Sequence, residues 1–178
     1  MEYKILIAGC GGQGILSLGK MFACAAMKQG FNVTYYPSYG AEVRGGTAKC
    51  GVIISDNPIA SPIVYEADSL IAFNEASIRK YLSVLKNDGT LVLNSSLISN
   101  PKLPANNYSV CFVQATKIAK DLGIEKAANM VMAGSFLNKN SLITQNAFWD
   151  SFDDVFGNLK KELKQLNIEA FKEGLKYE

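Results

Sequence analysis

The sequence predicts an α/β fold, with a Rossmann-like, open and mostly parallel sheet, helices on both faces and a helical C-terminal tail. Short apolar runs alternate along the chain with segments of helical spacing, which is typical of open α/β sheets. Most of these runs are apolar on both faces, as strands covered on two sides must be. The first run leads directly into a glycine-rich turn, which is where such sheets place their ligands.

The length and composition indicate one soluble domain. The chain has 178 residues and shows neither an internal repeat nor a linker-like stretch, so we expect a single domain over residues 1–178. The apolar run before Gly9 is too short for a signal peptide or a membrane span, which predicts a cytoplasmic protein without a membrane partner. Lys plus Arg number 18 and Asp plus Glu number 16, a net charge of +2, which does not suggest nucleic-acid binding.

Six segments have the apolar, β-branched composition of strands. They are Tyr3–Ala8, Asn32–Tyr36, Ala48–Ser55, Ser69–Phe73, Thr90–Asn94 and Ser109–Val113. The stretch Pro37–Thr47 is too short and glycine-rich for a crossover helix, so the strand after it is free to run antiparallel to its neighbour. The stretch Asp56–Asp68 carries two prolines and is predicted to be a loop over the sheet edge.

Helical spacing of apolar residues predicts the remaining elements. The expected helices are Ile15–Gln29, Asn74–Lys86, Gln114–Gly123, Ala127–Leu137 and the amphipathic tail Gln145–Tyr177. Asn74 is expected to cap its helix, and Gly123 to end its helix in a left-handed conformation. For Ala127–Leu137, and for the aromatic residues of the tail, burial in the core is favoured over contact with a partner.

The turn after the first strand matches a phosphate-binding pattern. Gly9, Gly11 and Gly14 fit G-x-G-x-x-G, which brings backbone N–H groups and a helix N-terminus toward an anion. A dinucleotide site also needs an acidic residue near the end of the second strand, and none stands there. A nucleotide-dependent oxidoreductase and an S-adenosylmethionine methyltransferase both normally have an acid after the second strand, which this sequence lacks. The extra residues Gly12 and Gln13 make the turn unusual for a nucleotide site.

A second group of candidate residues lies in the stretch Tyr39–Ala48. Glu42 and Arg44 stand two positions apart among three glycines, so a charged pair is presented on a backbone that can bend sharply. Arg44 suits a phosphate, a carboxylate or an acidic group of a partner, because its planar fork binds such groups bidentately. The alternative is a solvated surface pair of little energetic consequence.

The residue types exclude several catalytic sites. The chain contains no histidine, and its four cysteines, Cys10, Cys24, Cys50 and Cys111, have no C-x-x-C spacing. A zinc site, an iron–sulfur cluster of its own and a nucleophile activated by histidine are therefore not expected.

Four sequence motifs together resemble a known family. They are IAGCGGQGI from Ile7, PSYGAEVRGGTAKCGVIIS from Pro37, NMVMAGSFL from Asn129 and NIEAFKEGL from Asn167. In order and spacing they resemble the gamma subunit of 2-oxoacid:ferredoxin oxidoreductases, of the 2-oxoglutarate or branched-chain 2-oxoacid (ketoisovalerate) type rather than the pyruvate type. The resemblance covers nearly the whole chain.

The resemblance implies a non-cofactor subunit of an enzyme complex that is inactive alone. Such a complex decarboxylates a 2-oxoacid, here 2-oxoglutarate by preference, with thiamine diphosphate and Mg²⁺. It passes electrons through 4Fe-4S clusters to ferredoxin and delivers the acyl group to coenzyme A. The implied partners are alpha and beta subunits, with a delta subunit in some complexes. A homodimer is an option for the isolated chain, and a purely structural scaffold subunit is the alternative.

The candidate contacts to coenzyme A or to partner subunits come from the two loops, which are expected to form one surface at the carboxyl ends of the strands. They are Gly9, Gly11, Gly12, Gln13, Gly14, Tyr39, Gly40, Glu42, Arg44, Gly45, Gly46 and Thr47. No residue of this chain is expected to be catalytic or to bind a metal.

Overall fold

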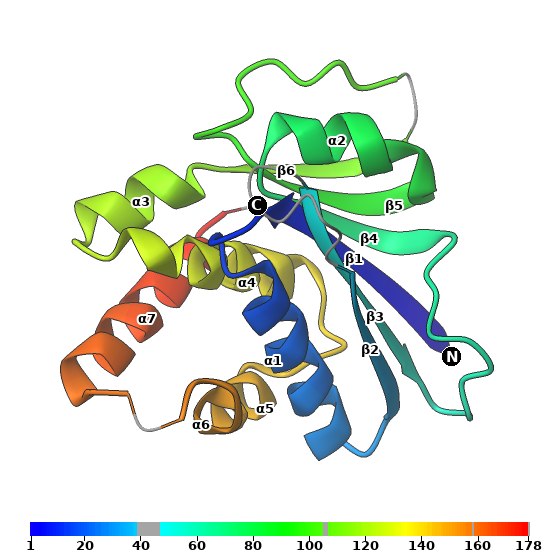
Figure 1. Ribbon diagram of the computed structural model, residues 1–178, viewed down its shortest axis with the longest axis horizontal. Coiled ribbons are helices and arrows are strands. Elements are labelled where there is room, and N and C mark those ends of the chain that lie inside the picture. Colours follow the sequence, from blue (N-terminus) through cyan, green and yellow to red (C-terminus); the bar gives the residue numbers. More distant parts are fainter. Residues whose placement is uncertain (39–46, 105–106, 158, 178) are drawn as a thin grey trace.

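The protein is built on one sheet, seen here in a computed structural model that describes residues 1–38, 47–104, 107–157 and 159–177. The described residues form a six-stranded sheet of order β2-β3-β1-β4-β5-β6 with helices on both faces (Figure 1). The strands are β1 (Glu2–Cys10), β2 (Asn32–Ser38), β3 (Thr47–Ser55), β4 (Ala67–Ala72), β5 (Leu85–Asn94) and β6 (Ser109–Val113). The predicted α/β fold is confirmed.

The sheet is mostly parallel, with one antiparallel strand in its interior. β1 pairs in parallel with β4, β4 with β5 and β5 with β6. β3 runs antiparallel both to β1 and to β2, so β2 has the direction of β1 without touching it. β3 begins directly beyond the stretch that the sequence excluded as a crossover helix, which confirms the predicted antiparallel strand.

Most helices cover one face of the sheet. They are α1 (Ile15–Lys28), α3 (Ala115–Asp121), α4 (Ala128–Lys139), α5 (Gln145–Asp150), α6 (Phe152–Phe156) and α7 (Lys161–Gly174), with the 3₁₀ turn η3 (Glu125–Ala127) before α4. Their buried residues form one large core with Ile5 and Ile7 of β1, whereas Leu6 and Ala8 point to the opposite face. β1 is therefore apolar on both sides because both sides are covered.

The predicted burial of two helical segments is confirmed. Every residue from Ala128 to Leu137 in α4 is buried. In the tail, Phe148 and Phe152 are fully buried, and the ring of Phe148 stacks on Phe171 of α7 at 5.2 Å between centroids. The tail is divided into α5, α6 and α7, with a break at Gly157, whose φ is 63°.

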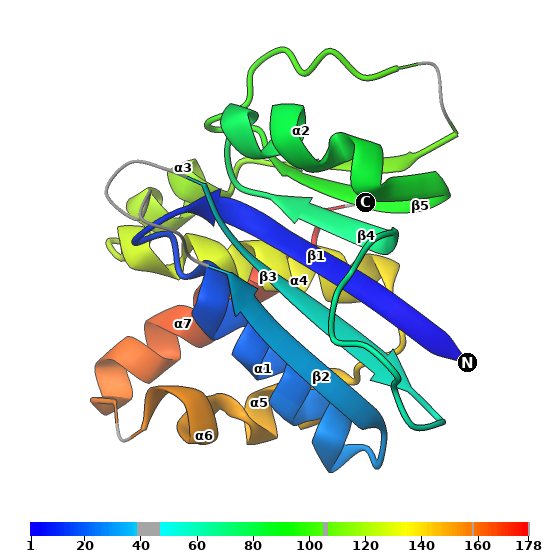
Figure 2. The same ribbon diagram turned by 45° about the vertical axis from the view of Figure 1, so that its right-hand side comes forward.

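In the described residues, the other face carries one α-helix, α2 (Glu75–Tyr81), which contacts β1 and β4. It lies on the opposite side of the sheet from α1 and α4 (Figure 2). The segment predicted as a helix to Lys86 is shorter: α2 ends at Tyr81, a 3₁₀ turn covers Leu82–Val84, and β5 already begins at Leu85. Leu85 is opposite Ala67 in the parallel pair, so strand pairing overrides helical spacing there. The helical spacing gave a wrong prediction here because Leu85 would be buried in a helix and is also buried in the strand.

The segment between β3 and β4 is the loop that its prolines predict. Residues 56–66 contain no helix or strand, and Val64 packs over Gly51, where an added Cβ would lie 2.8 Å from its methyl group. In the described residues, this loop covers β1 and β3 on the face of the sheet that carries α2 (Figure 2). None of the helices in the described ranges is long and apolar enough to cross a membrane.

Candidate functional site

The glycine turn, Gly9–Gly14, joins the carboxyl end of β1 to α1. Gly12 and Gly14 have φ values of 89° and 73°, which L side chains rarely adopt. A Cβ on Gly9 would lie only 2.9 Å from the Cβ of Phe73 at the end of β4. Gly12 and Gly14 are therefore required by the path of the backbone, and Gly9 by close packing against neighbouring side chains.

Gln13 stabilises the turn from within. Its Oε1 accepts a hydrogen bond from the backbone N–H of Cys10 at 2.7 Å and a second from Asn74 Nδ2 at 3.3 Å. Asn74 also donates to Cys10 Sγ at 3.0 Å and caps α2 by accepting from the Ser77 N–H. The unusual amide in the turn thus links the ends of β1 and β4.

The N-terminus of α1 offers a favourable site for an anion. α1 is 14 residues long, Gly14 is its N-cap, and its first turn contains no acidic side chain. The first N–H groups of a helix lack internal partners and carry the positive end of the helix dipole. The turn therefore presents the electrostatic features expected of the glycine pattern.

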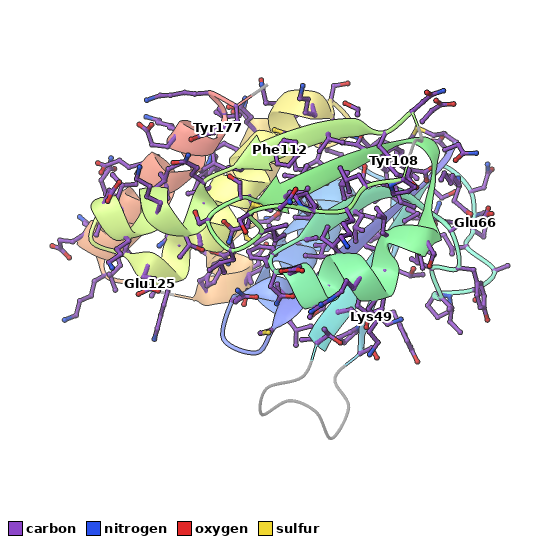
Figure 3. All side chains as sticks on the ribbon, turned by 90° about the horizontal axis from the view of Figure 1, so that it is seen from above. Lys49, Glu66, Tyr108, Phe112, Glu125 and Tyr177 are labelled. Carbon is purple, nitrogen blue, oxygen red and sulfur yellow. The ribbon has the colours of Figure 1, made fainter. Side chains whose placement is uncertain are left out.

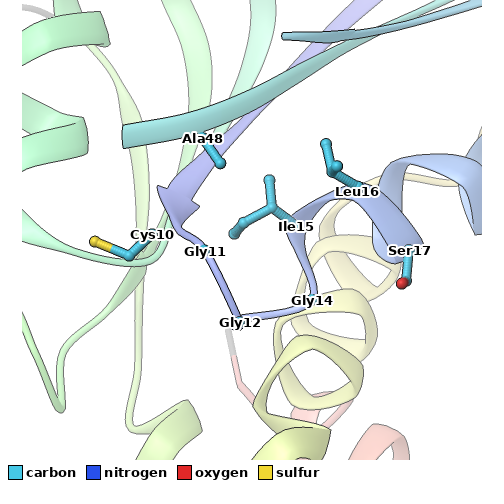
Figure 4. Close-up of a pocket in the computed structure, with 8 residues that line it drawn as sticks. All are labelled: Cys10, Gly11, Gly12, Gly14, Ile15, Leu16, Ser17 and Ala48. Carbon is cyan, nitrogen blue, oxygen red and sulfur yellow. The ribbon is translucent and has the colours of Figure 1, made fainter. Parts of the chain in front are cut away.

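Two adjacent pockets flank the turn. The turn pocket, about 500 Å³, lies between the turn, α1 and the start of β3 (Figure 4). It is lined by Cys10, Gly11, Gly12, Gly14, Ile15, Leu16, Ser17 and Ala48. The edge pocket, about 330 Å³, lies on the other side of Gly12. It is lined by Gly12, Gln13, Phe73, Leu97, Thr116, Glu125, Lys126 and Ala128.

The edge pocket occupies the topological switch point of the sheet. The connection after β1 passes over the large helical face as α1, whereas the connection after β4 passes over the opposite face as α2. The carboxyl ends of β1 and β4 therefore diverge at Gly12 and Phe73, which both line this pocket. Open α/β sheets bind their ligands in such a crevice.

The second group of candidate residues is described only at its end. Thr47 is opposite Cys10 in the β1–β3 ladder, and its Oγ1 accepts a hydrogen bond from Lys80 Nζ at 3.2 Å. It therefore lies beside the glycine turn, as predicted. The other members, Tyr39, Gly40, Glu42, Arg44, Gly45 and Gly46, lie outside the described residues.

The topology explains why no acidic residue follows the second strand. In dinucleotide-binding folds the second strand is the neighbour of the first, so its acid reaches the ribose above the glycine turn. Here β3 lies between β1 and β2. The end of β2 is thereby displaced from the glycine turn by one strand, and its tyrosines and Pro37 need not contact a ligand there.

The site belongs to a recognisable family. A family model described as pyruvate ferredoxin/flavodoxin oxidoreductase matches residues 4–177. The chain belongs to the pyruvate ferredoxin/flavodoxin oxidoreductase family. The family resemblance seen in the sequence is confirmed.

Some relatives within this oxidoreductase family are much longer than this chain, and others have a similar length. Ketoisovalerate oxidoreductase subunit VorA of Methanothermobacter marburgensis is 33% identical over 97% of this chain, which spans only 36% of that relative. The 2-oxoglutarate synthase subunit KorC of the same organism is 31% identical, and the match covers 98% of this chain and 95% of KorC. The chain thus spans about a third of the VorA relatives.

Solved structures share the family fold. The gamma subunit of a keto/oxoacid ferredoxin oxidoreductase from Geobacter sulfurreducens superposes with a TM-score of 0.85 at 31% identity, covering 99% of this chain and 95% of that one. A 2-oxoglutarate:ferredoxin oxidoreductase from Magnetococcus marinus, with 2-oxoglutarate, coenzyme A and succinyl-CoA bound, gives 0.89 at 25% identity. That match covers 98% of this chain and 30% of the larger one.

The described residues of this family member do not fit an iron–sulfur cluster or a Mg²⁺ site. They contain no group of three His, Cys, Asp or Glu side chains close enough to hold a metal. Burial raises the pKa of the Cys50 thiol to about 12, so Cys50 stays a neutral thiol beneath α1.

Sequence reasoning missed three residues of the site. Asn74 was assigned only as a helix cap, although it also holds the turn. Asn129 of α4 donates to the Gly14 carbonyl at 3.4 Å, and Lys126 of η3 lines the edge pocket. Asn129 is the first residue of the motif NMVMAGSFL, and this motif was the one feature of the sequence that could have indicated its role at the site. Nothing in the sequence indicates that η3 faces the glycine turn, because that proximity arises from the packing of α4.

Proposed function

We propose that this chain is the gamma-type, non-cofactor subunit of a thiamine diphosphate- and iron–sulfur-dependent 2-oxoacid:ferredoxin oxidoreductase. The main support for this proposal is the match to subunits of the same length. KorC of Methanothermobacter marburgensis and the Geobacter gamma subunit each align with this chain over 95% of their length. The complex oxidatively decarboxylates a 2-oxoacid to an acyl-CoA and reduces ferredoxin. The chain is inactive alone.

The cofactors of the complex belong to partner subunits in this proposal. Thiamine diphosphate, Mg²⁺ and 4Fe-4S clusters are assigned to alpha, beta and, where present, delta subunits. This is supported by the sequence, which has no histidine and only four dispersed cysteines. The isolated chain is free to form a homodimer when these partners are absent.

The proposed 2-oxoacid is 2-oxoglutarate. KorC relatives of matching length are 2-oxoglutarate synthase subunits, and the Magnetococcus structure holds 2-oxoglutarate. Ketoisovalerate is the competing substrate, because VorA relatives are at least as similar in sequence as KorC relatives, 33% against 29–31%. The ratio of kcat/KM for the two oxoacids in the purified complex decides between them.

The glycine turn and the Tyr39–Thr47 stretch are proposed to contact coenzyme A as it approaches the partner subunits. The supporting features are the open crevice at the switch point and an α1 N-terminus free of acidic side chains. Arg44 remains the proposed anchor for a phosphate of coenzyme A or a carboxylate of a partner. The backbone N–H groups of the first turn of α1 would neutralise charge without a metal.

A purely structural scaffold role is the second candidate. It is favoured by one observation: Gln13 Oε1 and Gly9 make their contacts inside the chain. The two roles differ in whether the turn touches coenzyme A.

The test is to purify the tagged chain gently from its native cells without oxygen and to assay what accompanies it. Co-purified subunits, iron, thiamine diphosphate and reduction of ferredoxin dependent on both 2-oxoglutarate and coenzyme A are the expected result. A chain that purifies alone with a bound nucleotide would contradict it. In the active complex, Arg44→Ala is expected to raise the KM for coenzyme A, whereas an unchanged KM supports the scaffold role.

A further inference from the structure

The strand β2 forms one edge of the sheet. It is the outermost strand on its side and pairs with β3 alone (Figure 2). None of its residues is buried, although β3 beside it is buried along most of its length. The seven residues Asn32–Ser38 include no charged side chain. Because charges on an edge strand keep it from pairing with another chain, β2 lacks a common protection against such pairing.

The hydrogen-bond pattern shows which main-chain groups of β2 turn away from β3. The Asp56 N–H donates to the Met1 carbonyl at 3.2 Å, so the odd-numbered residues at the start of the β1–β3 ladder bond to β3. Since bonding alternates along antiparallel strands, β3 turns its even-numbered residues to β1 and its odd-numbered residues to β2. The odd-numbered residues of β3 lie opposite even-numbered residues of β2. The main-chain groups of Val33, Tyr35 and Pro37 therefore point to the outer edge.

The ends of this edge fit a pairing of β2 with β2 of a second copy. Pro37 has no N–H, and its position on the outer side costs the ladder with β3 no hydrogen bond. An antiparallel pairing centred on Thr34 sets Pro37 of one copy opposite Phe31 of the other. The Phe31 N–H already donates to the Ala26 carbonyl at 3.2 Å inside its own chain. The ladder therefore ends where neither residue has an N–H to offer.

The centre of such a pairing falls on Thr34. Its Oγ1 is buried and has no hydrogen-bond partner among the described residues. Thr34 would face its counterpart as a non-hydrogen-bonded pair, whose side chains are the closest in an antiparallel ladder, and threonines in such pairs hydrogen-bond to each other. Val33 of each copy would lie opposite Tyr35 of the other, a favourable pair of a β-branched and an aromatic residue. A second copy thus supplies what the centre of β2 lacks.

Exposed apolar side chains extend this surface on the face of the sheet that carries α2. Tyr36 is 47% exposed, and Ile63 and Tyr65 of the loop after β3 are 41% and 74% exposed. Tyr36 and Ile63 line one small hollow over Gly51. Exposed apolar patches mark interaction surfaces, and tyrosine is enriched there. In the pairing centred on Thr34, Tyr36 lies opposite Asn32 of the second copy and is covered by it.

We propose that two copies of this chain form a homodimer by antiparallel pairing of their β2 strands, with Thr34 on the twofold axis. Val33 of each copy exchanges main-chain hydrogen bonds with Tyr35 of the other, while the Tyr35 hydroxyl keeps its bond to the Leu16 carbonyl. A second copy is the occupant because the edge is self-complementary, as a twofold interface must be. This inference does not depend on the proposed function, and it names the surface of a homodimer that the proposed function leaves open.

Sedimentation equilibrium of the isolated chain tests the dimer. The wild-type chain is expected to be dimeric at micromolar concentration. Tyr36→Lys replaces an apolar contact by a charge in both copies and is expected to raise the Kd of the dimer about tenfold. Phe112→Lys is the matched control, because Phe112 is 48% exposed on β6, the opposite edge strand. Phe112 lies across the molecule from Lys49 of β3 (Figure 3), and its variant should dimerise like the wild type.

A second variant removes main-chain bonds of the dimer alone. Val33→Pro deletes the N–H that faces the other copy and leaves the hydrogen bonds between β2 and β3 in place. Two bonds are lost by symmetry, so the Kd is expected to rise about tenfold. Circular dichroism checks that the variant folds. Because Tyr36 is exposed, Tyr36→Lys tests the proposal even if Val33→Pro does not fold.

Cysteine cross-linking tests the register. Thr34→Cys places two thiols on the twofold axis, where facing Cα atoms are about 4.5 Å apart, within the range of a disulfide. Mild oxidation is expected to join two chains of this variant. Ser38→Cys is the control, because its counterpart would lie about 25 Å away along the paired strands. The wild-type chain, with its four native cysteines, gives the background.

The outcomes decide the proposal independently of coenzyme A. A wild-type chain that stays monomeric throughout the micromolar range overturns it, and so does a dimer that Tyr36→Lys and Val33→Pro both leave intact. Cross-linking of Thr34→Cys to a different subunit in the purified complex also overturns it, because a partner's strand would then occupy the edge. None of these results affects 2-oxoacid oxidation dependent on coenzyme A, whose absence would overturn the proposed function alone.

Discussion

Gln13 shows how one side chain sets the shape of the site. Its oxygen closes the turn onto Cys10, while Nε2 donates no hydrogen bond to another described residue. Gln13 lines the edge pocket. The acceptor is thus structural, and the donor is not used by the described residues. Changes at Gln13 can therefore separate the stability of the turn from its ability to bind an anion.

Gln13→Ala is expected to lower the free energy of unfolding by about 1–2 kcal/mol, because the Cys10 N–H loses its partner in a partly buried turn. Urea denaturation measures the change. Gln165→Ala is the control, since Gln165 makes an exposed contact to Glu169 on α7. Gln13→Glu keeps the acceptor and adds a negative charge, so it should fold normally and weaken coenzyme A binding. Equal stability of Gln13→Ala and wild type would contradict the structural role.

Cys50 predicts a pH dependence. Its thiol has a pKa of about 12 when folded and 9.0 when unfolded, because burial disfavours the thiolate. Above pH 9 the unfolded chain therefore binds fewer protons, and stability falls by up to about 1.4 kcal/mol per pH unit from this group. Below pH 9 both states keep the proton and Cys50 adds no slope.

The slope of unfolding free energy against pH, measured between pH 8 and 10 in the wild-type chain and in Cys50→Ala, tests this prediction. The variant should lose stability less steeply, whatever its stability at neutral pH. Its slope should not vanish, because desolvation also raises the pKa of Tyr3. Parallel curves for the two proteins would show that Cys50 ionises alike in both states.

Among individual residues, the sequence predicted those whose role depends only on neighbours along the chain. Gly9, Gly12 and Gly14 could be found because a turn between a strand and a helix has a recognisable spacing. Asn74 and Asn129 could not be assigned to the turn, because their partners lie 64 and 115 positions away and only the fold brings them together.

α4 and α7 pack more closely than any other helix pair in the described chain. Gly134 lies against the backbone of Phe171, and Gly174 lies against the backbone of Val131, so each helix presents a glycine to the other. A side chain at either position would meet backbone atoms, which cannot rotate away. The buried α4 is therefore fixed in place by the tail, and η3 with Lys126 is fixed with it.

Gly134→Ala is expected to destabilise the protein by about 3 kcal/mol, although alanine is intrinsically the better helix former. The propensity gain of about 1 kcal/mol is smaller than the cost of forcing two backbones apart. Thermal and urea denaturation measure the net change. Lys172→Ala, at an exposed position of α7, is the control and should stay within about 0.5 kcal/mol of wild type. A stabilised Gly134→Ala would show that the helices are free to separate.

At the level of elements, the sequence predicted most strands and helices because each carries its own period. It failed at residues 82–86, where apolar residues spaced for a helix instead lead into β5. Lys86 pairs with Asp68 at 2.6 Å across the start of β4, and Asp88 has a φ of 64° in the strand. Pairing with β4 decides this segment, and pairing is a property of the sheet, which a local pattern does not contain.

At the scale of the whole molecule, two hydrophobic cores share one sheet. The large core lies under α1, α3, α4 and the tail, and the smaller one under α2. Alternate residues of β1 contribute to each core, so neither can be lost without disrupting the other. We therefore propose that the chain is one cooperative domain.

Calorimetry of the isolated chain should then show a single transition whose calorimetric and van't Hoff enthalpies agree. The mutation Ile78→Ala under α2 and the mutation Phe148→Ala under α1 should lower the same Tm rather than create a second transition. Two resolved transitions in either variant would mean that the α2 side unfolds independently. Circular dichroism and tryptophan fluorescence, which reports on Trp149, should follow coincident curves.

The direction of β1 places the Met1 ammonium, which pairs with Asp56 at 2.9 Å, at the opposite edge of the sheet from Gly12. Nine residues of extended chain separate the two ends of β1, about 30 Å. Extending the polypeptide at Met1 would cost only an exposed ion pair, worth about 0–1 kcal/mol. Gene fusion can therefore join this domain to another subunit without obstructing the crevice, and an affinity tag at Met1 would likewise leave the crevice open.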